Sequence, residues 1–329
     1  MAGVQCAGRA VRTKGEDMAL LAEQEYPESA SFPEDLAVLV GFVRMWRGQK
    51  LAAQMLTDAP RTRRWLVEDE TGKRCCVVAP GSGAAGTDVS DICEGLLRAS
   101  MLGIGPKVYE VNRDTGVAVV EYLEGYEACE PATMRDQQLS IKAMDAYRAL
   151  HRSRLFNRTN TLFQQTDHLL ATVANMDIQL PDYAEGLLAD YRKAKDAFSA
   201  SGLDIAPCHN SPRPGNFLVK GNALKMVEYN ACANNDTSCE LGMFFSEMLY
   251  DDDDMLKLLN VYSGYLDVDR IARVRAARVV ASLERGLWGV IQSASKESYY
   301  DYWKYGMWKF RQAYSYKCQL DWEAVLADI

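Results

Sequence analysis

One short loop carries polar residues whose types and spacing could support transfer of a phosphoryl group. His209 stands at the start of the loop, Ser211 and Asn216 lie within it, and Glu228 follows the next apolar stretch. Phosphoryl transfer needs a group that accepts the proton of the attacking hydroxyl, together with an amide and a carboxylate that hold Mg²⁺. Asn216 comes five residues after Ser211, so one loop can present the base and a metal ligand together. At the position of the base, however, the chain has a serine.

Three further polar positions occur in an order that fits the same chemistry. Glu94 lies on a predicted helix, an acidic hinge runs from Glu121 to Gly125, and His151 lies on a later predicted helix. Any one of these residues alone would be interpreted as an ordinary loop or surface residue. The complete series, in this order along the chain, favours a phosphotransfer site.

The elements that must position these residues divide the chain into two lobes. Residues 1–32 form an irregular tail, and the part that follows carries a helical pattern after Pro33, two predicted strand pairs (64–78 and 108–122) and a helix between them. Beyond Gly125 the pattern is mainly helical, at about 135–155, 163–175, 183–200, 240–263, 268–295 and 299–317, with a strand–loop–strand insert at 205–230. We therefore predict an α+β, bilobal fold: a small β-rich N-terminal lobe (33–125) and a larger helical C-terminal lobe (126–329).

The composition argues against several classes of protein. A chain of 329 residues is long enough for two lobes, and a net charge of −8 with a pI near 5.1 argues against a nucleic-acid-binding protein. No apolar run reaches the length of about 18 residues that a membrane helix needs. Nine scattered cysteines indicate reduced thiols and a cytoplasmic location. The densest basic patch, Arg61, Arg63 and Arg64, is interpreted as a solvated strand edge.

The chain resembles the choline/ethanolamine kinase family, within the aminoglycoside-phosphotransferase and protein-kinase-like superfamily. The resemblance covers residues 35–318 and is most specific in the loop 209–218 and in the block 287–292. It implies a bilobal protein-kinase-like fold, ATP and Mg²⁺ as cofactors, and a small amine or alcohol as the acceptor. The site positions that it implies are His209, Ser211 and Asn216 for catalysis, Asn216 and Glu228 for the metal, Glu94, Glu121 and Leu123 for the nucleotide, and Asn230, Arg285, Trp288 and Tyr305 for the substrate.

The catalytic positions depart from the family pattern. The family's catalytic aspartate falls on Ser211, and a serine hydroxyl cannot act as a base near neutral pH without help. The metal-binding aspartate falls on Glu228, which keeps the carboxylate but displaces it by one methylene. The acid that the family has two residues later falls on Asn230.

The predicted N-terminal lobe also lacks expected residues. The basic residue of the second strand falls on Val78 or Ala79, which leaves Glu94 without its usual ion-pair partner. Lys73 or Arg74 would be the substitutes. The phosphate-binding loop of the family survives at most as residues 55–58.

Aromatic residues are concentrated near the C-terminus. In the family, aromatics at the positions of Trp288 and Tyr305 help to form a cage for a quaternary ammonium, which cation–π attraction stabilises. Arg285 stands where the family often has another tryptophan, and its charge would repel a choline-like group. Core packing and a ligand cage are equally good interpretations of Trp288 and Tyr305.

Two other motifs point to different chemistry. A GxGxxG pattern suggests a dinucleotide-binding turn, but the antiparallel strand pair that follows it favours an ordinary strand-to-helix loop; its residues are Gly81, Gly83 and Gly86. A zinc site can be assembled from residues whose spacing fits no common zinc module: Cys208, His209, Cys232 and Cys239.

Three functional hypotheses follow. The first is a pseudokinase-like protein that binds a ligand or a partner in the cleft, because several catalytic positions have changed together. The second is an active, divergent ATP-dependent phosphotransferase that acts on a choline-like, ethanolamine-like or other small alcohol. The third is a non-catalytic scaffold, which would expose an apolar patch at 299–316.

Overall fold

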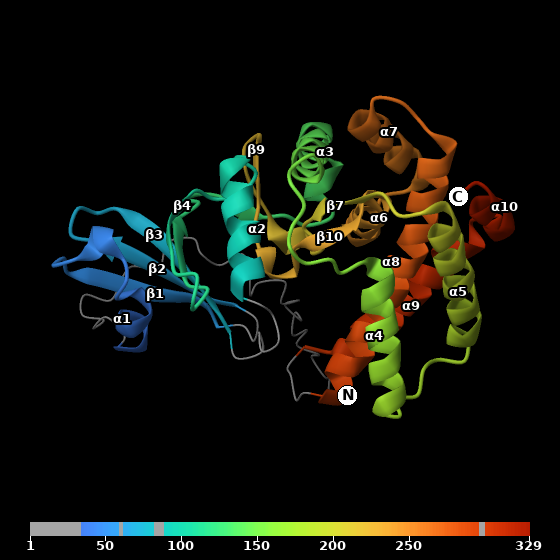
Figure 1. Ribbon diagram of the computed structural model, residues 1–329, viewed down its shortest axis with the longest axis horizontal. Coiled ribbons are helices and arrows are strands. Elements are labelled where there is room, and N and C mark those ends of the chain that lie inside the picture. Colours follow the sequence, from blue (N-terminus) through green and yellow to red (C-terminus); the bar gives the residue numbers. More distant parts are fainter. Residues whose placement is uncertain (1–33, 59–61, 82–88, 296–299) are drawn as a thin grey trace, which may run out of the picture.

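The protein consists of two lobes that lie side by side (Figure 1). The computed structural model describes residues 34–58, 62–81, 89–295 and 300–329. The smaller lobe contains an antiparallel sheet and the larger lobe is mainly helical, as predicted from the sequence. None of the described helices has both the length and the apolar character that a membrane crossing requires.

The sheet of the N-terminal lobe has five antiparallel strands in the order β1-β2-β3-β5-β4. Its strands are β1 (Leu51–Asp58), β2 (Thr62–Asp69), β3 (Arg74–Pro80), β4 (Val108–Val111) and β5 (Ala118–Glu121). The two predicted strand pairs are confirmed as β2–β3 and β4–β5. A wholly antiparallel sheet provides no parallel βαβ unit, so it rules out the dinucleotide interpretation of the glycine motif. Gly83 and Gly86 of that motif lie outside the described residues.

Alternate residues of the strands face opposite sides of the sheet. Helix α1 (Glu34–Val40) covers one side, where its Leu36 joins a core cluster with Cys75 and Val77. Helix α2 (Val89–Met101) covers the other side, where Leu96 packs in a cluster with Cys76. This second side faces the larger lobe, so residues of β2 and β3 that point to it can reach the cleft.

Strand β1 was not predicted. Residues 55–58, expected to be the remnant of a phosphate-binding loop, belong to this strand and pair with β2. The expectation was wrong because Leu, Ala, Gln and Met are common in helices and loops, and only the pairing with a non-local partner makes the segment a strand.

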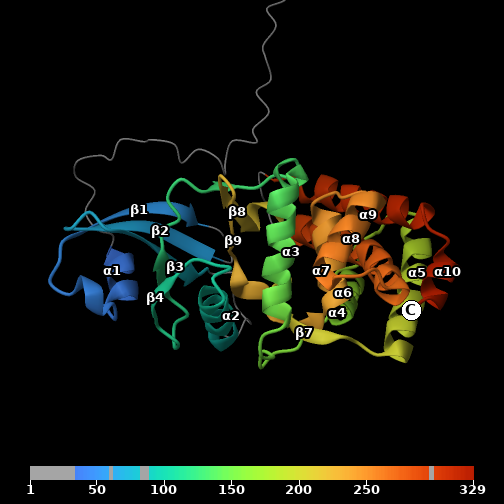
Figure 2. The same cartoon turned by 90° about the horizontal axis from the view of Figure 1, so that it is seen from above.

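The larger lobe contains the predicted helices and a few short strands. The helices are α3 (Gln137–His151), α4 (Leu162–Asn175), α5 (Ala184–Ser201), α6 (Thr237–Glu247), α7 (Asp252–Ser263), α8 (Val268–Ser295), α9 (Tyr302–Cys318) and α10 (Trp322–Ala327). The short strands are β6 (Glu127–Ala128), β7 (Ile205–Cys208), β8 (Phe217–Lys220), β9 (Ala223–Met226) and β10 (Ala233–Asp236). Strands β8 and β9 lie beside α3 at the boundary with the smaller lobe (Figure 2).

The predicted helical range 240–263 is two helices. Helix α6 ends at Glu247, and Leu249 follows with a left-handed φ of 57°. The side chain of Asp251 then caps α7 by accepting a hydrogen bond from the Asp254 N–H at 2.8 Å. The acidic run is therefore a helix start, as its charge at a helix N-terminus predicts.

Helices α8 and α9 approach each other closely at glycines. A Cβ on Gly289 would lie 2.7 Å from Cα and 2.9 Å from N of Gly306, and a Cβ on Gly306 would lie 3.1 Å from the Gly286 carbonyl oxygen. The absence of side chains lets the two backbones touch. This contact fixes the positions of Trp288 and Tyr305, which lie next to these glycines in sequence.

We predict that Gly289→Ala destabilises the protein by about 1–3 kcal/mol, because the added methyl group meets backbone atoms that cannot move separately. Urea unfolding followed by circular dichroism measures the change. Gly186→Ala is the matched control: Gly186 lies exposed on α5 with nothing within 4 Å of its Cβ position. Helix propensity predicts a gain of roughly 0.5–1 kcal/mol there. Similar effects of the two substitutions would contradict the close packing of α8 and α9.

Candidate functional site

The loop that follows β7 is held in place by a buried carboxylate. Glu240, on α6 and fully buried, accepts hydrogen bonds from the backbone N–H of His209 at 3.0 Å and of Asn210 at 2.5 Å. The same carboxylate bonds His151 Nε2 at 2.8 Å, and His151 Nδ1 meets the hydroxyl of Tyr262 at 2.7 Å. Glu240 thus joins α3, α6 and the start of the loop.

Hydrogen bonding keeps Glu240 ionised in spite of its burial. Burial acts to raise its pKa, but the hydrogen bond and the charge of His151 outweigh that effect and leave the pKa lowered. The Asn210 side chain extends the network, since Asn235 Nδ2 donates to Asn210 Oδ1 at 2.8 Å. His151 and Glu240 therefore have structural roles that anchor the loop.

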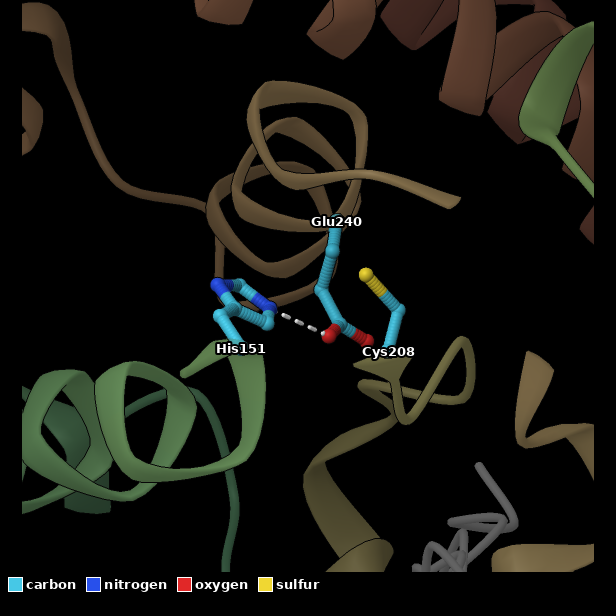
Figure 3. Close-up of side chains that lie close together, drawn as sticks. All are labelled: His151, Cys208 and Glu240. Carbon is cyan, nitrogen blue, oxygen red and sulfur yellow. Dashed lines mark hydrogen bonds and ion pairs between the residues drawn. The ribbon is translucent and has the colours of Figure 1, made fainter. Parts of the chain in front are cut away.

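Three potential metal ligands converge at this network (Figure 3). His151, Cys208 and Glu240 place ligand atoms within 4.8 Å of one another, and they form the only such group among the described residues. His151 bonds Glu240 directly, and burial raises the pKa of the Cys208 thiol well above its ordinary value. The direct bond shows that His151 and Glu240 are engaged with each other in a hydrogen-bonded core. The zinc set expected as an alternative is not brought together.

Ser211 lies beside Asn216, as their spacing predicts. Asn216 Nδ2 donates to the Ser211 carbonyl oxygen at 2.8 Å and to Ser211 Oγ at 2.9 Å. Asn216 belongs to a short 3₁₀ turn (Pro214–Asn216), which brings it back toward the start of the loop. The position of a catalytic base is thus occupied by a neutral hydroxyl that accepts a hydrogen bond.

Glu228 is engaged by residues of both lobes. Its carboxylate forms an ion pair with Arg64 of β2, through Oε1. Its Oε2 accepts a hydrogen bond from Thr62 at 3.1 Å, and Asn230 Nδ2 donates to the same Thr62 hydroxyl at 2.6 Å. Glu228 also adopts a left-handed backbone with φ 69°, a costly conformation for a residue with a side chain. The network joins the N-terminal sheet to the segment after β9.

Arg64 is a residue of the candidate site that the sequence analysis missed. We expected Arg61, Arg63 and Arg64 to form a solvated strand edge, but Arg64 is paired across the cleft; Arg61 lies outside the described residues. Arg64 lies opposite Val78 in the β2–β3 register, so both side chains point to the same side of the sheet. A cation therefore lies on β2, on the same side of the sheet as the position on β3 where one was expected. The sequence signal for this position of Arg64 was the alternation along β2, which places Thr62, Arg64 and Leu66 on the same side of the strand.

Trp288 and Tyr305 lie together, and a cation of the chain itself contacts the tryptophan. The two rings meet edge to face with centroids 6.0 Å apart. The Arg285 guanidinium carbon lies 5.7 Å from the Trp288 centroid, and Lys309 Nζ lies 5.8 Å from the Tyr305 centroid. Arg285 is paired with Glu284, its Nη2 lying 2.6 Å from the carboxylate, and Lys309 is paired with Glu247 at 2.7 Å.

A small pocket lies between the loop and helices α6 and α8. Its lining includes Ser211 and Arg213 from the loop, Glu247 from α6, and Glu284 and Arg285 from α8. The cavity volume is about 10 Å³, roughly the space of one water molecule. Arg285 lies near Trp288, whereas the sequence analysis did not identify the two carboxylates.

Comparisons with known proteins bear on the fold. No family model and no curated protein matches the chain. A choline/ethanolamine kinase family protein from Mesorhizobium loti matches with a TM-score of 0.76 and 22% identity, over 89% of this chain and 97% of that one. Choline kinase LicA from Streptococcus pneumoniae matches with a TM-score of 0.69 and 16% identity, over 88% of this chain and 100% of that one. Choline kinase from Cryptosporidium parvum matches with a TM-score of 0.71 and 14% identity, over 89% and 98%.

The chain has the protein-kinase-like fold. At identities of 22% and below, the likeness establishes the fold and not the activity. The activity has to be argued from the residues in the cleft.

The metal residues expected of this kinase-like chain do not fit Mg²⁺ as they are arranged. Mg²⁺ requires oxygen ligands in near-octahedral geometry. Both carboxylate oxygens of Glu228 are engaged within the protein, by Arg64 and by Thr62. The hydrogen bonds of Asn216 to Ser211 use its Nδ2 and not Oδ1, the atom that would bind a metal ion, so the misfit lies at Glu228. The carboxylate expected to bind the metal ion is thus half of an ion pair.

The nucleotide side of the kinase-like cleft also differs from expectation. Glu94 pairs with Arg98 on its own helix at 2.9 Å, and neither Lys73 nor Arg74 reaches it. Arg74 instead pairs with Glu124, and Lys73 lies 4.5 Å from the ring centroid of Tyr109. The i,i+4 spacing of Glu94 and Arg98 was a local signal for their pairing.

The hinge forms as a defined turn between the lobes. Strand β5 ends at Glu121, whose Oε2 accepts a hydrogen bond from the Lys107 N–H at 3.1 Å. The Leu123 carbonyl oxygen accepts from the Tyr126 N–H at 3.1 Å, and Gly125 takes a positive φ of 71°. Glu121 and Leu123 therefore lie where the lobes join, as the sequence predicts.

We predict that His209 makes stability fall as the pH drops below its unfolded pKa of about 6.5. Burial lowers the pKa of His209 in the folded state, and its Nε2 donates to the Val227 carbonyl oxygen at 2.9 Å. Below pH 6.5 the unfolded chain therefore gains a proton that the folded protein does not bind, which destabilises the fold by up to about 1.4 kcal/mol per pH unit.

Urea unfolding between pH 7.5 and 5.5 tests this linkage. His209→Gln removes the titrating group and should flatten the pH dependence, whatever its effect on absolute stability. His168→Gln, at an exposed position on α4, is the control and should keep the wild-type slope. Equal slopes for wild type and His209→Gln would refute the assignment.

Proposed function

We propose that this kinase-like protein does not transfer phosphate by the mechanism of its structural neighbours, and that it binds a ligand or a partner in the cleft between its lobes. The observation that carries the proposal is the ion pair between Arg64 and Glu228. It neutralises the carboxylate that a metal ion would need, and it does so with residues from both lobes.

The catalytic loop supports the same conclusion. Loss of a general base typically lowers the rate by about two to four orders of magnitude, and Ser211 supplies no carboxylate. His209 cannot replace the base, because its Nε2 bonds the Val227 carbonyl and the residue is fully buried. A missing base would impair removal of the proton from the attacking hydroxyl, and an engaged Glu228 would impair metal binding. Because these are separate requirements of phosphoryl transfer, the two changes together would lower the rate more than either alone.

One observation favours a second candidate, an active phosphotransferase for a small amine or alcohol that uses ATP and Mg²⁺. Asn216 and Glu228 remain neighbours, since the Val227 N–H donates to the Asn216 carbonyl oxygen at 2.9 Å. If the phosphates of ATP took Arg64 as their partner, Glu228 would be released beside Asn216. Positioning and charge neutralisation carry most of phosphoryl transfer, so a weak base alone does not abolish it.

We expect no transfer of phosphate from ATP–Mg to choline or ethanolamine at the rates of about 1–100 s⁻¹ typical of kinases. ADP release in a coupled assay, with product detection by mass spectrometry, provides the measurement. Turnover in that range would refute the proposal. Slow turnover that changes in Ser211→Asp would support the second candidate.

Thermal unfolding with ligands separates the binding modes, because a ligand that binds the folded state raises Tm. The ligands are ATP–Mg, ADP, choline and ethanolamine, each at matched ionic strength. Stabilisation by ATP–Mg would favour the enzyme, and stabilisation by an amine alone would favour a small-molecule binding protein. A response to none of them would favour the protein partner, for which Tyr300, Trp303, Trp308 and Tyr314 offer exposed rings.

We predict that Arg64 and Glu228 are energetically coupled. In a double-mutant cycle with Arg64→Met and Glu228→Gln, the interaction energy should be about 1–3 kcal/mol, because both side chains are largely buried. Arg64→Met should also expose Glu228 to metal ions, so Mn²⁺ binding, followed by electron paramagnetic resonance, should be stronger than in wild type. Arg74→Met is the control, since Arg74 pairs with the exposed Glu124. Coupling near zero would contradict a cross-lobe ion pair.

A further inference from the structure

Another cavity lies in the larger lobe, apart from the catalytic-type loop. It is lined by residues from the start of α7, from α8, from the end of α9 and from α10. Figure 1 shows α10 at the end of this lobe that lies away from the sheet. The cavity volume is about 340 Å³, within the range of about 300–1,000 Å³ that small-molecule sites occupy. It shares no lining residue with the pocket beside Ser211.

The side chain of Arg278 lines this cavity with its hydrogen-bonding capacity only partly used. It is 5% exposed, and its guanidinium carbon lies 4.2 Å from the ring centroid of Tyr316. Of its five N–H donors, one on Nη2 bonds the Tyr250 carbonyl oxygen at 2.5 Å and one on Nη1 bonds the weak acceptor Met255 Sδ at 3.5 Å. Its Nε has no partner among the described residues, and Asp252 Oδ1, 3.7 Å from Nη1, is beyond hydrogen-bond distance.

Arg273, on the same helix and 7% exposed, is a buried arginine with a complete set of acceptors. Its Nε donates to Asp269 at 2.9 Å, its Nη1 to Asp236 at 3.2 Å and its Nη2 to the Gly202 carbonyl oxygen at 2.8 Å. Each nitrogen of Arg273 thus has an oxygen acceptor, and two of the acceptors are carboxylates. Because a buried charge is costly unless its donors are filled, the contrast indicates that Arg278 has room for a carboxylate that the chain does not supply.

The charged groups around the cavity are two arginines and three aspartates: Asp252, Arg275, Arg278, Asp321 and Asp328. Arg275 is committed to Asp252, whose Oδ1 accepts from its Nε at 3.1 Å and whose Oδ2 accepts from its Nη2. Asp321 caps α10 through Oδ1, and neither Asp321 nor Asp328 is paired with a cation in the part of the chain that the structure describes. The cavity therefore offers one cation with unfilled donors and two carboxylates without a counter-ion.

We propose that this cavity is a ligand site outside the cleft and binds a small zwitterion, with its carboxylate at Arg278 and its ammonium at Asp321 and Asp328. A carboxylate suits the guanidinium because the two form charge-assisted hydrogen bonds. A simple anion would meet three aspartates, and a simple cation would leave the donors of Arg278 unfilled. The apolar side chains of the lining, Leu320 and Val325, suit a short aliphatic chain between the two charges. The site goes beyond the function proposed for the cleft and does not depend on it.

Titration of the full-length protein with 6-aminohexanoate by isothermal calorimetry tests the proposal. Hexanoate lacks the ammonium and hexylamine lacks the carboxylate, so these two compounds are matched probes at equal ionic strength. Wild type should bind 6-aminohexanoate more tightly than either probe by a factor of about ten or more, because each probe loses one charge-assisted contact.

Two variants locate the ligand. Arg278→Met removes the guanidinium, and Asp321→Asn combined with Asp328→Asn removes the two carboxylates while asparagine still caps α10. Each should bind 6-aminohexanoate about tenfold more weakly than wild type. Glu323→Gln is the matched control and should bind as wild type does, because Glu323 lies on α10, pairs with Lys193 and does not line the cavity.

The proposal is overturned if wild type does not bind 6-aminohexanoate at millimolar concentrations, or if hexanoate or hexylamine binds equally well. An unchanged affinity in the aspartate double variant would also overturn it, and this variant provides the test if Arg278→Met does not fold. Arg64→Met, which alters the cleft, should keep the wild-type affinity. Loss of binding in Arg64→Met would assign the ligand to the cleft and refute a separate site, whereas the phosphotransfer assay tests the cleft without reference to this cavity.

Discussion

The buried carboxylate of Glu240 is the interaction on which the cleft depends. It is the one group that bonds α3 through His151 and the loop backbone through His209 and Asn210 while belonging to α6. A buried, ionised carboxylate is stable only when several donors surround it, and removal of one donor leaves an unsatisfied charge. The loop is therefore fixed at its first two residues, and Ser211 and Asn216 follow in a defined geometry.

A common feature unites the rest of the cleft: its carboxylates are paired with cations from the same chain. Glu228 is paired with Arg64, Glu284 with Arg285, and Glu247 with Lys309. Each pair engages a carboxylate that a metal ion or a cationic ligand would otherwise be able to bind. In this protein the internal ion pairs neutralise these carboxylates without a metal ion or a cationic ligand.

The ion pair between Arg64 and Glu228 also restrains the relative position of the two lobes. Arg64 belongs to the sheet of the smaller lobe and Glu228 to the larger lobe, so their pairing resists separation of the lobes. The left-handed backbone of Glu228 shows that the segment after β9 is held in a costly conformation to make this contact. At the other end of the cleft, the glycine contact of α8 with α9 sets the position of Trp288 beneath Arg285.

The sequence by itself determined the order of the elements, the bilobal kinase-like fold and the proximity of Ser211 to Asn216. The order of the elements and the proximity follow from local spacing, through strand alternation, helical periodicity and a short loop, whereas the kinase-like fold was implied by the family resemblance. The sequence also contained the i,i+4 pair of Glu94 and Arg98, which the analysis overlooked. Strand β1 could not be predicted from the sequence, because this weakly patterned segment becomes a strand only through its pairing with β2.

Only the tertiary structure decided what the polar residues do. No spacing along the chain relates Arg64 to Glu228, and their contact depends on the register of β2 against β3 and on the docking of the two lobes. The same holds for Glu247 and Lys309, which meet because α6 and α9 both pack against α8. A sequence records which charges are present, whereas burial and three-dimensional proximity determine which of them are neutralised.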